Sequence, residues 1–518
     1  MKLLTADQIR ELDRCAIEDY AVPGVVLMEN AGRGAAQIVD ARYRSLSLGP
    51  ILVVAGKGNN GGDGYVMARH LENYGWQVRI LVLAARSEIS GDAQINLRIL
   101  ENSQSAISYA TTSVEIAAVL QQYADTVLVI DAIFGNGLNT PVRGHFLAAI
   151  EQINALKLPV VAVDMPSGVD ATTGEILGAA IKAECSISFA VAKLGQVSYP
   201  AFSCAGDLFV VDIGVPKSLQ DTISDQYVLV DEEYACSLLP TRPVAGHKGT
   251  FGHVLVVAGS LGKSGAAQLC AVGSARSGSG LVTLATPKVC QPVVATAVAE
   301  IMTCALDDFN GGLSAGAAEQ IIPLWQGKQV VAVGPGLGQT EQIGTLVARL
   351  VRECPVPLVI DADALNVLRV NVELMHDREP GSTVLTPHPG EMARLTGLSV
   401  EYIQSHRCEV AAQFAQQWQV VLVLKGARTV VAAPDGRMCI NNSGNSGMGS
   451  GGMGDVLTGV IAGWIAQGLD PFTAAVLGVY LHGMAADHCE QQLGSSGYLA
   501  GDLVQCLPTV RQTLINRR

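Results

Sequence analysis

Three short segments rich in glycine, asparagine and aspartate could form a ligand site in the first half of the chain. The first is GNNGGDG at 58–64, after the apolar run ILVVA and before a helical pattern. The second, VIDAIFGNGLNTPVRG, contains Asp131, and the third, VVAVDMPSGVD, contains Asp164 and Ser167. Each follows a strand-like run, and the carboxyl ends of parallel strands meet at one sheet edge, where ligands bind. We therefore expect these segments to form one site.

The first segment also has the spacing of a dinucleotide-binding turn, because Gly56, Gly58 and Gly61 fit G-x-G-x-x-G. A conventional NAD-binding domain needs an acid at the end of its second strand, but Arg86 stands there. This disfavours an ordinary dehydrogenase. One alternative is a tight turn capped by Asn60 or Asp63. The other is an anion site, since glycines let backbone N–H groups approach a ligand at a helix start.

A second glycine-rich segment, NNSGNSGMGSGGMGDVLTGVIAGWIA, occupies residues 441–466 and leads through five glycines into Asp455. A flexible loop with Asp455 as helix N-cap would need one acid but not five glycines. We favour an anion cradle that stabilises a transferring phosphoryl group, with Asp455 as base on the attacking hydroxyl. AGSLGKSGAA, near 258–267, is not a P-loop, because Val257 occupies the position of its first glycine. Lys263 could still meet a phosphate, and its role stays open.

Two series of apolar strand-like runs position these loops. The first comprises 51–55, 78–83, 126–131, 159–164, 186–190 and 208–214, and the second 253–259, 280–286, 329–336, 357–364, 383–390 and 420–426. Helix-length segments separate the runs, which implies right-handed crossovers and parallel sheets between helical layers. Helices are expected at 6–20 and 25–41, and at 455–467, 471–490 and 499–513. The pattern lapses between about 215 and 252, so we predict α/β domains at 1–222 and 223–518.

Composition restricts the partners. The 518 residues carry a formal net charge of -13, which argues against nucleic acid, since that binding needs a basic face. The 12 cysteines are scattered, with no C-x-x-C pair, so we expect reduced thiols in the cytosol. The first 20 residues lack the apolar core of a signal peptide, and no stretch is long enough to span a membrane. We expect a cytoplasmic homo-oligomer, although the pattern of the N-terminal helices does not prove pairing.

The first half resembles the epimerase domain of the NAD(P)H-hydrate repair enzymes, a Rossmann-like three-layer fold. MENAGRGAA, GNNGGDG, DAIFGNG and DMPSGVD occur in that family's order over most of residues 10–215. The resemblance implies that Asp164 touches the substrate, and we choose it as acid/base. It implies a potassium ion on Asn60, Asp131 and Ser167, which offer hard oxygens. It also implies substrate contacts from Asn59, Asn60, Gly61, Gly62, Asp63, Gly135, Asn136, Gly137, Leu138, Asn139, Thr140 and Pro141.

The chemistry expected there follows from the substrate. In a hydrated nicotinamide, the ring nitrogen can expel the hydroxyl on the adjacent carbon and leave an iminium ion. Water that returns to the other face inverts the centre. The enzyme must protonate the leaving hydroxyl and deprotonate the incoming water, a task we assign to one positioned carboxyl.

The second half resembles the dehydratase domain of the same enzymes. Its G-x-G-D ending is similar to the ribokinase-like superfamily, and HKGTFGHVLVVAGS, GKSGAA, RSGSGLVTLAT, GPGLGQT, LTPHPGEMARL and LKGARTVV narrow the match over roughly 245–510. One departure is Gly449, where the family often has alanine. The resemblance implies a hydrate site lined by Ala267, Gly338, His388 and Asp455. It implies an adenine-nucleotide site at Lys425, Gly426, Ala427, Arg428, Thr429 and Gly454.

By this resemblance the chain is bifunctional. One domain interconverts the R and S hydrates of NADH and NADPH (NADHX and NADPHX). The other dehydrates the S form while ADP, with Mg²⁺, becomes AMP and phosphate: Asp455 helps the ring hydroxyl accept a phosphoryl group, which the ring nitrogen then expels. The alternative is a ribokinase-like small-molecule kinase with a non-catalytic N-terminal nucleotide-binding module. The residues alone decide neither NADHX against NADPHX nor ADP against ATP.

Overall fold

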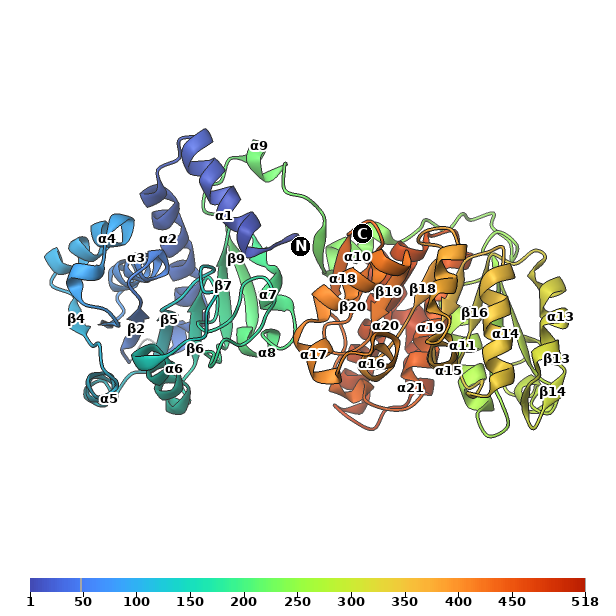
Figure 1. Ribbon diagram of the computed structural model, residues 1–518. Coiled ribbons are helices and arrows are strands. Elements are labelled where there is room, and N and C mark those ends of the chain that lie inside the picture. Colours follow the sequence, from blue (N-terminus) through green and yellow to red (C-terminus); the bar gives the residue numbers. More distant parts are fainter. Residues whose placement is uncertain (47–48, 518) are drawn as a thin grey trace. The chain divides into compact units, whose positions relative to one another are not determined.

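The computed structural model describes residues 1–46 and 49–517 and divides into two compact units (Figure 1). Lys2–Tyr227 form one unit, and the other contains Met1 and the chain from Val228 on. We predicted the domain boundary near residue 222, and the structural division falls between Tyr227 and Val228. Each unit has a largely parallel sheet covered by helices, so the predicted α/β class is confirmed.

The N-terminal sheet has seven parallel strands in the order β4-β3-β2-β5-β6-β7-β9. Their bounds are β2 (Ile51–Ala55), β3 (Val78–Val82), β4 (Ala106–Tyr109), β5 (Leu128–Ala132), β6 (Val160–Val163), β7 (Cys185–Phe189) and β9 (Asp207–Val211). From the central pair β2 and β5 the chain adds strands outward in both directions. The loops after these two strands therefore diverge and leave a crevice at the carboxyl edge.

Alternate residues of β2 enter two separate cores, as expected for a strand buried on both faces. Ile51 and Val53 pack in one core, and Leu52 and Val54 in the other. The first core is completed by α2 (Gly24–Tyr43), α3 (Asn59–Asn73) and α4 (Gly91–Asn102), and the second by α5 (Ser113–Gln122) and α6 (Gly144–Leu156). The sequence missed β4, an edge strand whose residues are half-buried or exposed.

The helix predicted over 6–20 is α1 (Ala6–Arg14), which continues as a π-helical turn, Cys15–Asp19. Thr5 begins it with a capping box, and Ile9 and Leu12 bury its apolar side. Before it, β1 (Leu3–Leu4) pairs in parallel with β8 (Ala192–Lys193). Short helices follow at α7 (Leu194–Val197), α8 (Phe202–Ala205) and α9 (Lys217–Gln220). The first residues thus lie beside a strand far away in the sequence.

The C-terminal sheet has ten strands in the order β10-β21-β20-β19-β18-β17-β16-β11-β12-β13. They are β10 (Tyr227–Val230), β11 (His253–Val257), β12 (Leu281–Pro287), β13 (Met302–Leu306), β16 (Val330–Val333), β17 (Leu358–Ile360), β18 (Thr383–Leu385), β19 (Val421–Leu424), β20 (Val430–Ala432) and β21 (Met438–Asn441). Strands β11–β13 and β16–β19 are parallel, whereas β19, β20 and β21 form an antiparallel meander. The order reverses between β11 and β16, which places the crevice there.

Helices cover both faces of this sheet. One side holds α11 (Ser264–Arg276), α19 (Met453–Ala466), α20 (Pro471–Leu493) and α21 (Ala500–Asn516), and the other α14 (Glu341–Glu353), α15 (Ala362–Leu368), α16 (Pro389–Thr396), α17 (Val400–Ser405) and α18 (Arg407–Trp418). Smaller elements are α10 (Glu232–Leu238), α12 (Gln291–Ala295), α13 (Ala318–Ile321), β14 (Asp308–Phe309) and β15 (Gly312–Leu313). Within 1–46 and 49–517, no helix has both the length and the hydropathy to cross a membrane.

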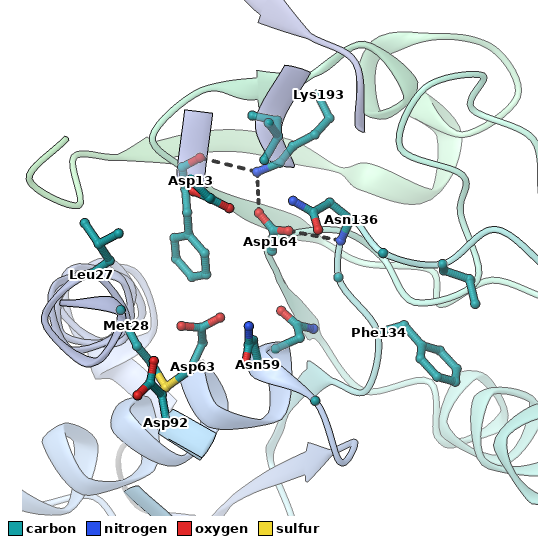
Figure 2. A pocket seen from close by; sticks show the side chains of 18 of the residues that line it. Asp13, Leu27, Met28, Asn59, Asp63, Asp92, Phe134, Asn136, Asp164 and Lys193 are labelled. Carbon is teal, nitrogen blue, oxygen red and sulfur yellow. Dashed lines mark hydrogen bonds and ion pairs between the residues drawn. The ribbon is translucent and has the colours of Figure 1, made fainter. Parts of the chain in front are cut away.

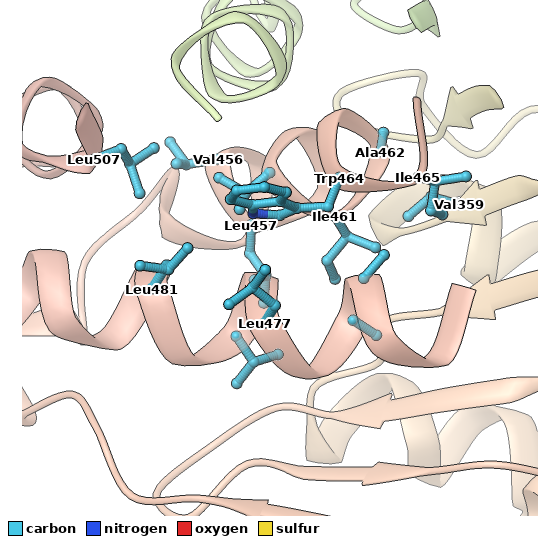
Figure 3. Close-up of a cluster of buried hydrophobic side chains, with 14 of the residues drawn as sticks. Val359, Val456, Leu457, Ile461, Ala462, Trp464, Ile465, Leu477, Leu481 and Leu507 are labelled. Carbon is cyan, nitrogen blue, oxygen red and sulfur yellow. The ribbon is translucent and has the colours of Figure 1, made fainter. Parts of the chain in front are cut away.

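Glycines let α19 lie against α11. A Cβ atom on Gly459 would stand 1.9 Å from the carbonyl oxygen of Cys270, and one on Gly273 would stand 2.6 Å from that of Val456. On its other sides α19 packs Leu457 and Trp464 among the leucines of α20 and α21 (Figure 3). This packing fixes the helix whose first turn carries Asp455.

Gly459→Ala should lower the free energy of unfolding by about 1–3 kcal/mol, because the added methyl group meets backbone that cannot move aside alone. Denaturant titration followed by circular dichroism measures this. The matched control is Gly501→Ala in α21, where no atom lies within 4 Å of the new Cβ. An equal loss of stability in both variants would contradict the packing argument.

Candidate functional sites

A cavity of about 610 Å³ opens at the carboxyl ends of β2, β5 and β6 (Figure 2). It brings together most of the substrate-contact residues implied for the N-terminal unit: Asn59, Asn60, Asp63, Gly135, Asn136, Gly137, Leu138, Asn139, Thr140 and Asp164. Three other predicted residues lie outside the lining. Gly61 packs against the Gly56 carbonyl, Gly62 packs against Met28, and Pro141 is exposed. The three segments therefore share one sheet edge.

Helix α3 begins at this cavity without a side-chain cap. Its N-cap residue is Gly58, so the alternative in which Asn60 or Asp63 caps the turn is wrong. The Asn60 side chain is buried, yet neither its oxygen nor its nitrogen has a hydrogen-bond partner. A Cβ atom on Gly135 would lie 3.1 Å from Asp164 Oδ2 and 3.3 Å from Asn60 Oδ1. A buried amide without a partner is costly unless a ligand completes it.

Asp131 and Ser167 form a compact buried pair beside the cavity. The Ser167 hydroxyl and backbone N–H donate to the two carboxylate oxygens of Asp131 at 2.6 and 2.8 Å, and the Ile133 N–H donates at 3.2 Å. Burial raises the pKa of Asp131 to about 6, and the bonds from Ser167 oppose that rise. The Phe134 N–H donates to the Ser167 hydroxyl oxygen at 2.9 Å, which ties the pair to the loop after β5.

Asp164 is held in an unusual conformation at the end of β6. Its φ of 64° lies in the left-handed region, which non-glycine residues seldom adopt. Its buried carboxylate is paired with the ammonium group of Lys193 and accepts the Asn136 N–H at 3.2 Å. Lys193, only 1% exposed, also donates to the Ser188 hydroxyl at 2.9 Å and the Phe189 carbonyl at 3.3 Å.

Sequence reasoning missed Lys193, although one signal was available. In SFAVAKLG, Lys193 is the only charged residue of an apolar segment that follows a strand. A lysine in such a segment must pair with an acid or pay a large desolvation cost.

Two further carboxyl groups, those of Asp13 and Asp63, line the same cavity (Figure 2). Burial, with repulsion from Asp164, raises the pKa of Asp13 to about 6 and that of Asp63 well above its ordinary value. Lys193 acts against both shifts. The sequence did not single out Asp13, because it lies in a helix rather than at a strand end.

In the C-terminal unit, Gly452 with φ 90° is the N-cap of α19, and no side-chain cap bond is made. The alternative in which Asp455 caps this helix is therefore wrong. Asp455 is half-buried in the first turn. Burial, followed by repulsion from Asp361, raises its pKa to about 6. A carboxyl group with such a pKa can accept a proton near neutral pH.

The half-buried Lys425 and the buried Asp361 form an ion pair next to α19. The Lys425 ammonium group donates to Asp361 Oδ1 at 2.8 Å, and the Thr458 hydroxyl donates to Oδ2 at 2.7 Å. Burial would lower the pKa of Lys425, but Asp361 and Glu391 together raise it, so the lysine stays charged. A Cβ atom on Gly454 would stand 3.2 Å from Lys425 Nζ. Glycine at 454 therefore leaves room beside a fixed positive charge.

The other predicted nucleotide residues follow Lys425 directly. Gly426 has φ 134°, and its carbonyl accepts the Thr429 hydroxyl at 2.8 Å, while Ala427 is exposed. The Arg428 side chain donates to Asn442, and burial lowers the pKa of its guanidinium. These residues form one turn between β19 and β20.

His388 caps α16, since its Nδ1 accepts the Gly390 and Glu391 N–H groups at 3.0 and 3.3 Å. Burial lowers its pKa, against the effect of Glu391. The ring is half exposed, and its Nε2 is 3.5 Å from Glu391 Oε1. A capping role explains its position, and contact with a substrate stays a prediction.

Asp363 connects two loops near β11 and β16, where the strand order of the C-terminal sheet reverses. It accepts the Gly338 N–H at 2.8 Å and pairs with Lys263 at 3.0 Å. Lys263, whose role the sequence left open, thus fixes the loop after β11 to the start of α15. Ala267 lies fully buried in α11.

The glycine-rich loop before α19 is anchored by residues that the sequence did not indicate. Asp487 of α20 accepts the Gly444 N–H at 2.9 Å and the Asn445 side-chain amide at 3.0 Å. The Tyr498 hydroxyl donates to the side-chain oxygen of Asn445 at 2.6 Å. These bonds fix one end of the loop, while Gly449 and Gly451 stay exposed.

Comparisons with known proteins agree with the division of the chain into two units. A protein-family model described as NAD(P)H-hydrate dehydratase matches residues 254–509, and one described as YjeF-related protein N-terminus matches residues 24–195. The bifunctional NAD(P)H-hydrate repair enzyme Nnr of Moorella thermoacetica is 43% identical, covering 99% of this chain and 97% of its own. That of Escherichia coli is 35% identical, covering 98% of this chain and 93% of its own.

Among solved structures, the ADP/ATP-dependent NAD(P)H-hydrate dehydratase of Bacillus subtilis is 35% identical, with a TM-score of 0.50. The similarity covers 55% of this chain and 98% of the Bacillus chain. The predicted ribokinase-like dehydratase fold of the second unit is thus confirmed.

Asp63→Asn should raise the melting temperature of the N-terminal unit by several degrees at pH 8, and by less at pH 5. A raised folded-state pKa means that the folded state binds the proton more tightly, so stability is lost as pH rises above the ordinary pKa of an aspartate. Asparagine removes the buried charge. Scanning calorimetry at both pH values checks this, with the exposed Asp7→Asn as control. A gain that does not depend on pH would contradict it.

Proposed function

Because the chain belongs to the family of bifunctional NAD(P)H-hydrate repair enzymes, we propose that its two sites carry the two steps of that repair. The N-terminal unit interconverts the R and S hydrates of NAD(P)H, and the C-terminal unit dehydrates the S form. The observation that carries this division is a separate set of buried acids and one lysine at the carboxyl edge of each sheet.

In the epimerase site we assign acid–base work to Asp164. Lys193 and the Asn136 N–H hold its carboxylate in one position, which lowers the cost of orienting it for proton transfer. The uncapped N–H groups of α3 and the glycine-rich loop after β5 suit the phosphates and ribose of a dinucleotide. Proton transfer at a positioned carboxyl contributes roughly 100- to 10,000-fold to a rate.

We also propose that this unit binds potassium through Asn60, Asp131 and Ser167. The buried Asn60 oxygen without a partner fits such an ion, and the carboxylate and hydroxyl oxygens are donors of the right class. When bound, the ion would supply positive charge close to the substrate.

In the dehydratase site we assign Asp455 as the base that prepares the ring hydroxyl for phosphoryl transfer. The N–H groups at the uncapped start of α19 would bind the transferred group, and Lys425 adds a fixed positive charge. The Bacillus relative was co-crystallised with ATP and Mg²⁺. We propose that this chain takes ADP with Mg²⁺, and that the turn from Lys425 to Thr429 binds the nucleotide. Full-length similarity to repair enzymes favours this function over the small-molecule kinase.

Asp455→Ala should abolish dehydration and leave epimerisation intact, whereas Asp164→Asn should do the reverse. The loss expected is at least about 100-fold in each case, since each change removes one proton carrier. Recovery of dihydronicotinamide absorbance from hydrated NADH with ADP and Mg²⁺ measures the first activity, and separation of the two epimers measures the second. If either folded variant lost both activities, the independence of the sites would be refuted. A stable phosphorylated product in place of NADH would favour the kinase.

Potassium chloride should raise the melting temperature of the N-terminal unit more than lithium or choline chloride does at equal ionic strength, because an ion that binds only the folded state stabilises it. Asn60→Ala should remove that difference. Calorimetry without substrate measures it. An equal response to all three salts in the unchanged protein would argue against the potassium site.

A further inference from the structure

A third acid faces the epimerase cavity from an element outside the loops described above. Asp13 lies on α1, half-buried, and its carboxyl group lines the cavity with those of Asp63 and Asp164 (Figure 2). It follows Leu12, which is buried in the core, so the packing of α1 turns Asp13 toward the cavity edge. The other acids of the same helix, Asp7 and Glu11, are exposed and pair with arginines instead.

Inversion at a ring carbon needs proton transfer on both faces of the ring, which one fixed carboxylate does not provide. The hydroxyl leaves from one face of the nicotinamide ring, and water must return to the opposite face. Asp164 is held by Lys193 on one side and by the Asn136 N–H on the other, so it cannot follow the reaction around the ring. A second proton carrier on another wall of the cavity would serve the second face.

We propose that Asp13 is this second catalytic residue, an inference that rests on the epimerase function proposed above. In one direction, protonated Asp13 gives its proton to the departing hydroxyl, the C–O bond breaks, and the ring nitrogen supplies the electron pair that forms the iminium. Water adds to the other face and gives a proton to the Asp164 carboxylate. The products are the opposite epimer, ionised Asp13 and protonated Asp164, the form ready for the reverse direction. One proton passing between the carboxyl groups through solvent restores the first form.

The charges around Asp13 favour this division of roles. Asp63 of α3 and Asp164 face it as acids, Lys193 of β8 faces it as the cation, and Asp92 of α4 and Lys57 lie further along the lining. Lys57 is paired with Glu88 at 3.4 Å. Burial and the Asp164 charge raise the pKa of Asp13 to about 6, so it carries a proton more readily than an ordinary aspartate. Asp164, whose carboxylate is paired with Lys193, is placed to accept the proton of the incoming water.

The test starts from one purified epimer of hydrated NADH without nucleotide, which leaves the dehydratase idle. Epimerisation is followed from pH 5 to pH 9 above a protein-free blank. For the unchanged protein, kcat/KM should fall as pH rises above about 6, because Asp13 then loses its proton. Asp13→Asn should lower kcat/KM roughly 100- to 10,000-fold and abolish that fall. Asp13→Glu should restore part of the rate and of the pH dependence.

Glu11→Gln is the matched control on the same helix, with an exposed side chain, and should behave as the unchanged protein. Dehydration of the S hydrate with ADP and Mg²⁺ should be equal in all variants. A melting transition of the N-terminal unit at or above that of the unchanged protein, measured by calorimetry, confirms that this unit is folded. A slower Asp13→Asn with the original pH dependence, or an unchanged rate, would overturn the assignment, as would loss of the pH dependence in Asp63→Asn alone. If the unchanged protein did not exceed the blank, the epimerase function itself would fail.

Discussion

Each sheet edge buries more acidic than basic charge, and this imbalance underlies the chemistry of both units. At each edge one lysine is paired with an aspartate, and further acids lie close to the same lysine. The groups are Asp13, Asp63 and Asp164 around Lys193, and Asp361, Glu391 and Asp455 around Lys425. Because a low dielectric penalises uncompensated charge, burial raises the pKa of Asp13 and Asp455 to about 6 and that of Asp63 well above its ordinary value. These buried acids lower the stability of the folded protein, and they are useful only when a substrate is present.

The starts of two helices also lack stabilising contacts at positions that could bind a ligand. Both α3 and α19 begin at a glycine without a side-chain cap, in a protein that caps α1 and α20 with Thr5 and Asp470. An uncapped helix start leaves N–H groups free, which costs stability unless an anion or water binds them. The same segments contain the glycines that admit a ligand. At α3 and α19 the uncapped start therefore coincides with the glycine-rich loops where we propose that phosphate groups bind.

Much of this arrangement could be predicted from the sequence, because strand ends are easy to locate. Apolar runs indicated the parallel strands, and the polar residues after them, such as Asn60 and Asp131, met at one edge as expected for such sheets. What could not be predicted came from elsewhere. Asp13 lies on an amphipathic helix where an acid looks like an ordinary surface residue, and Lys193 on a two-residue strand too short to give a pattern. The edge strand β4 escaped notice because half of its residues are exposed.

The pairing of β1 with β8 has a consequence for the order in which the N-terminal unit is completed. Leu4 lies opposite Lys193, so the start of the chain can close on its partner strand only after almost 200 residues have left the ribosome. Until then Asp164 has no cation beside it, and the helix that carries Asp13 has no strand to hold its preceding residues. A nascent chain can thus form its central strands early, but the epimerase cavity is among the last features to be completed.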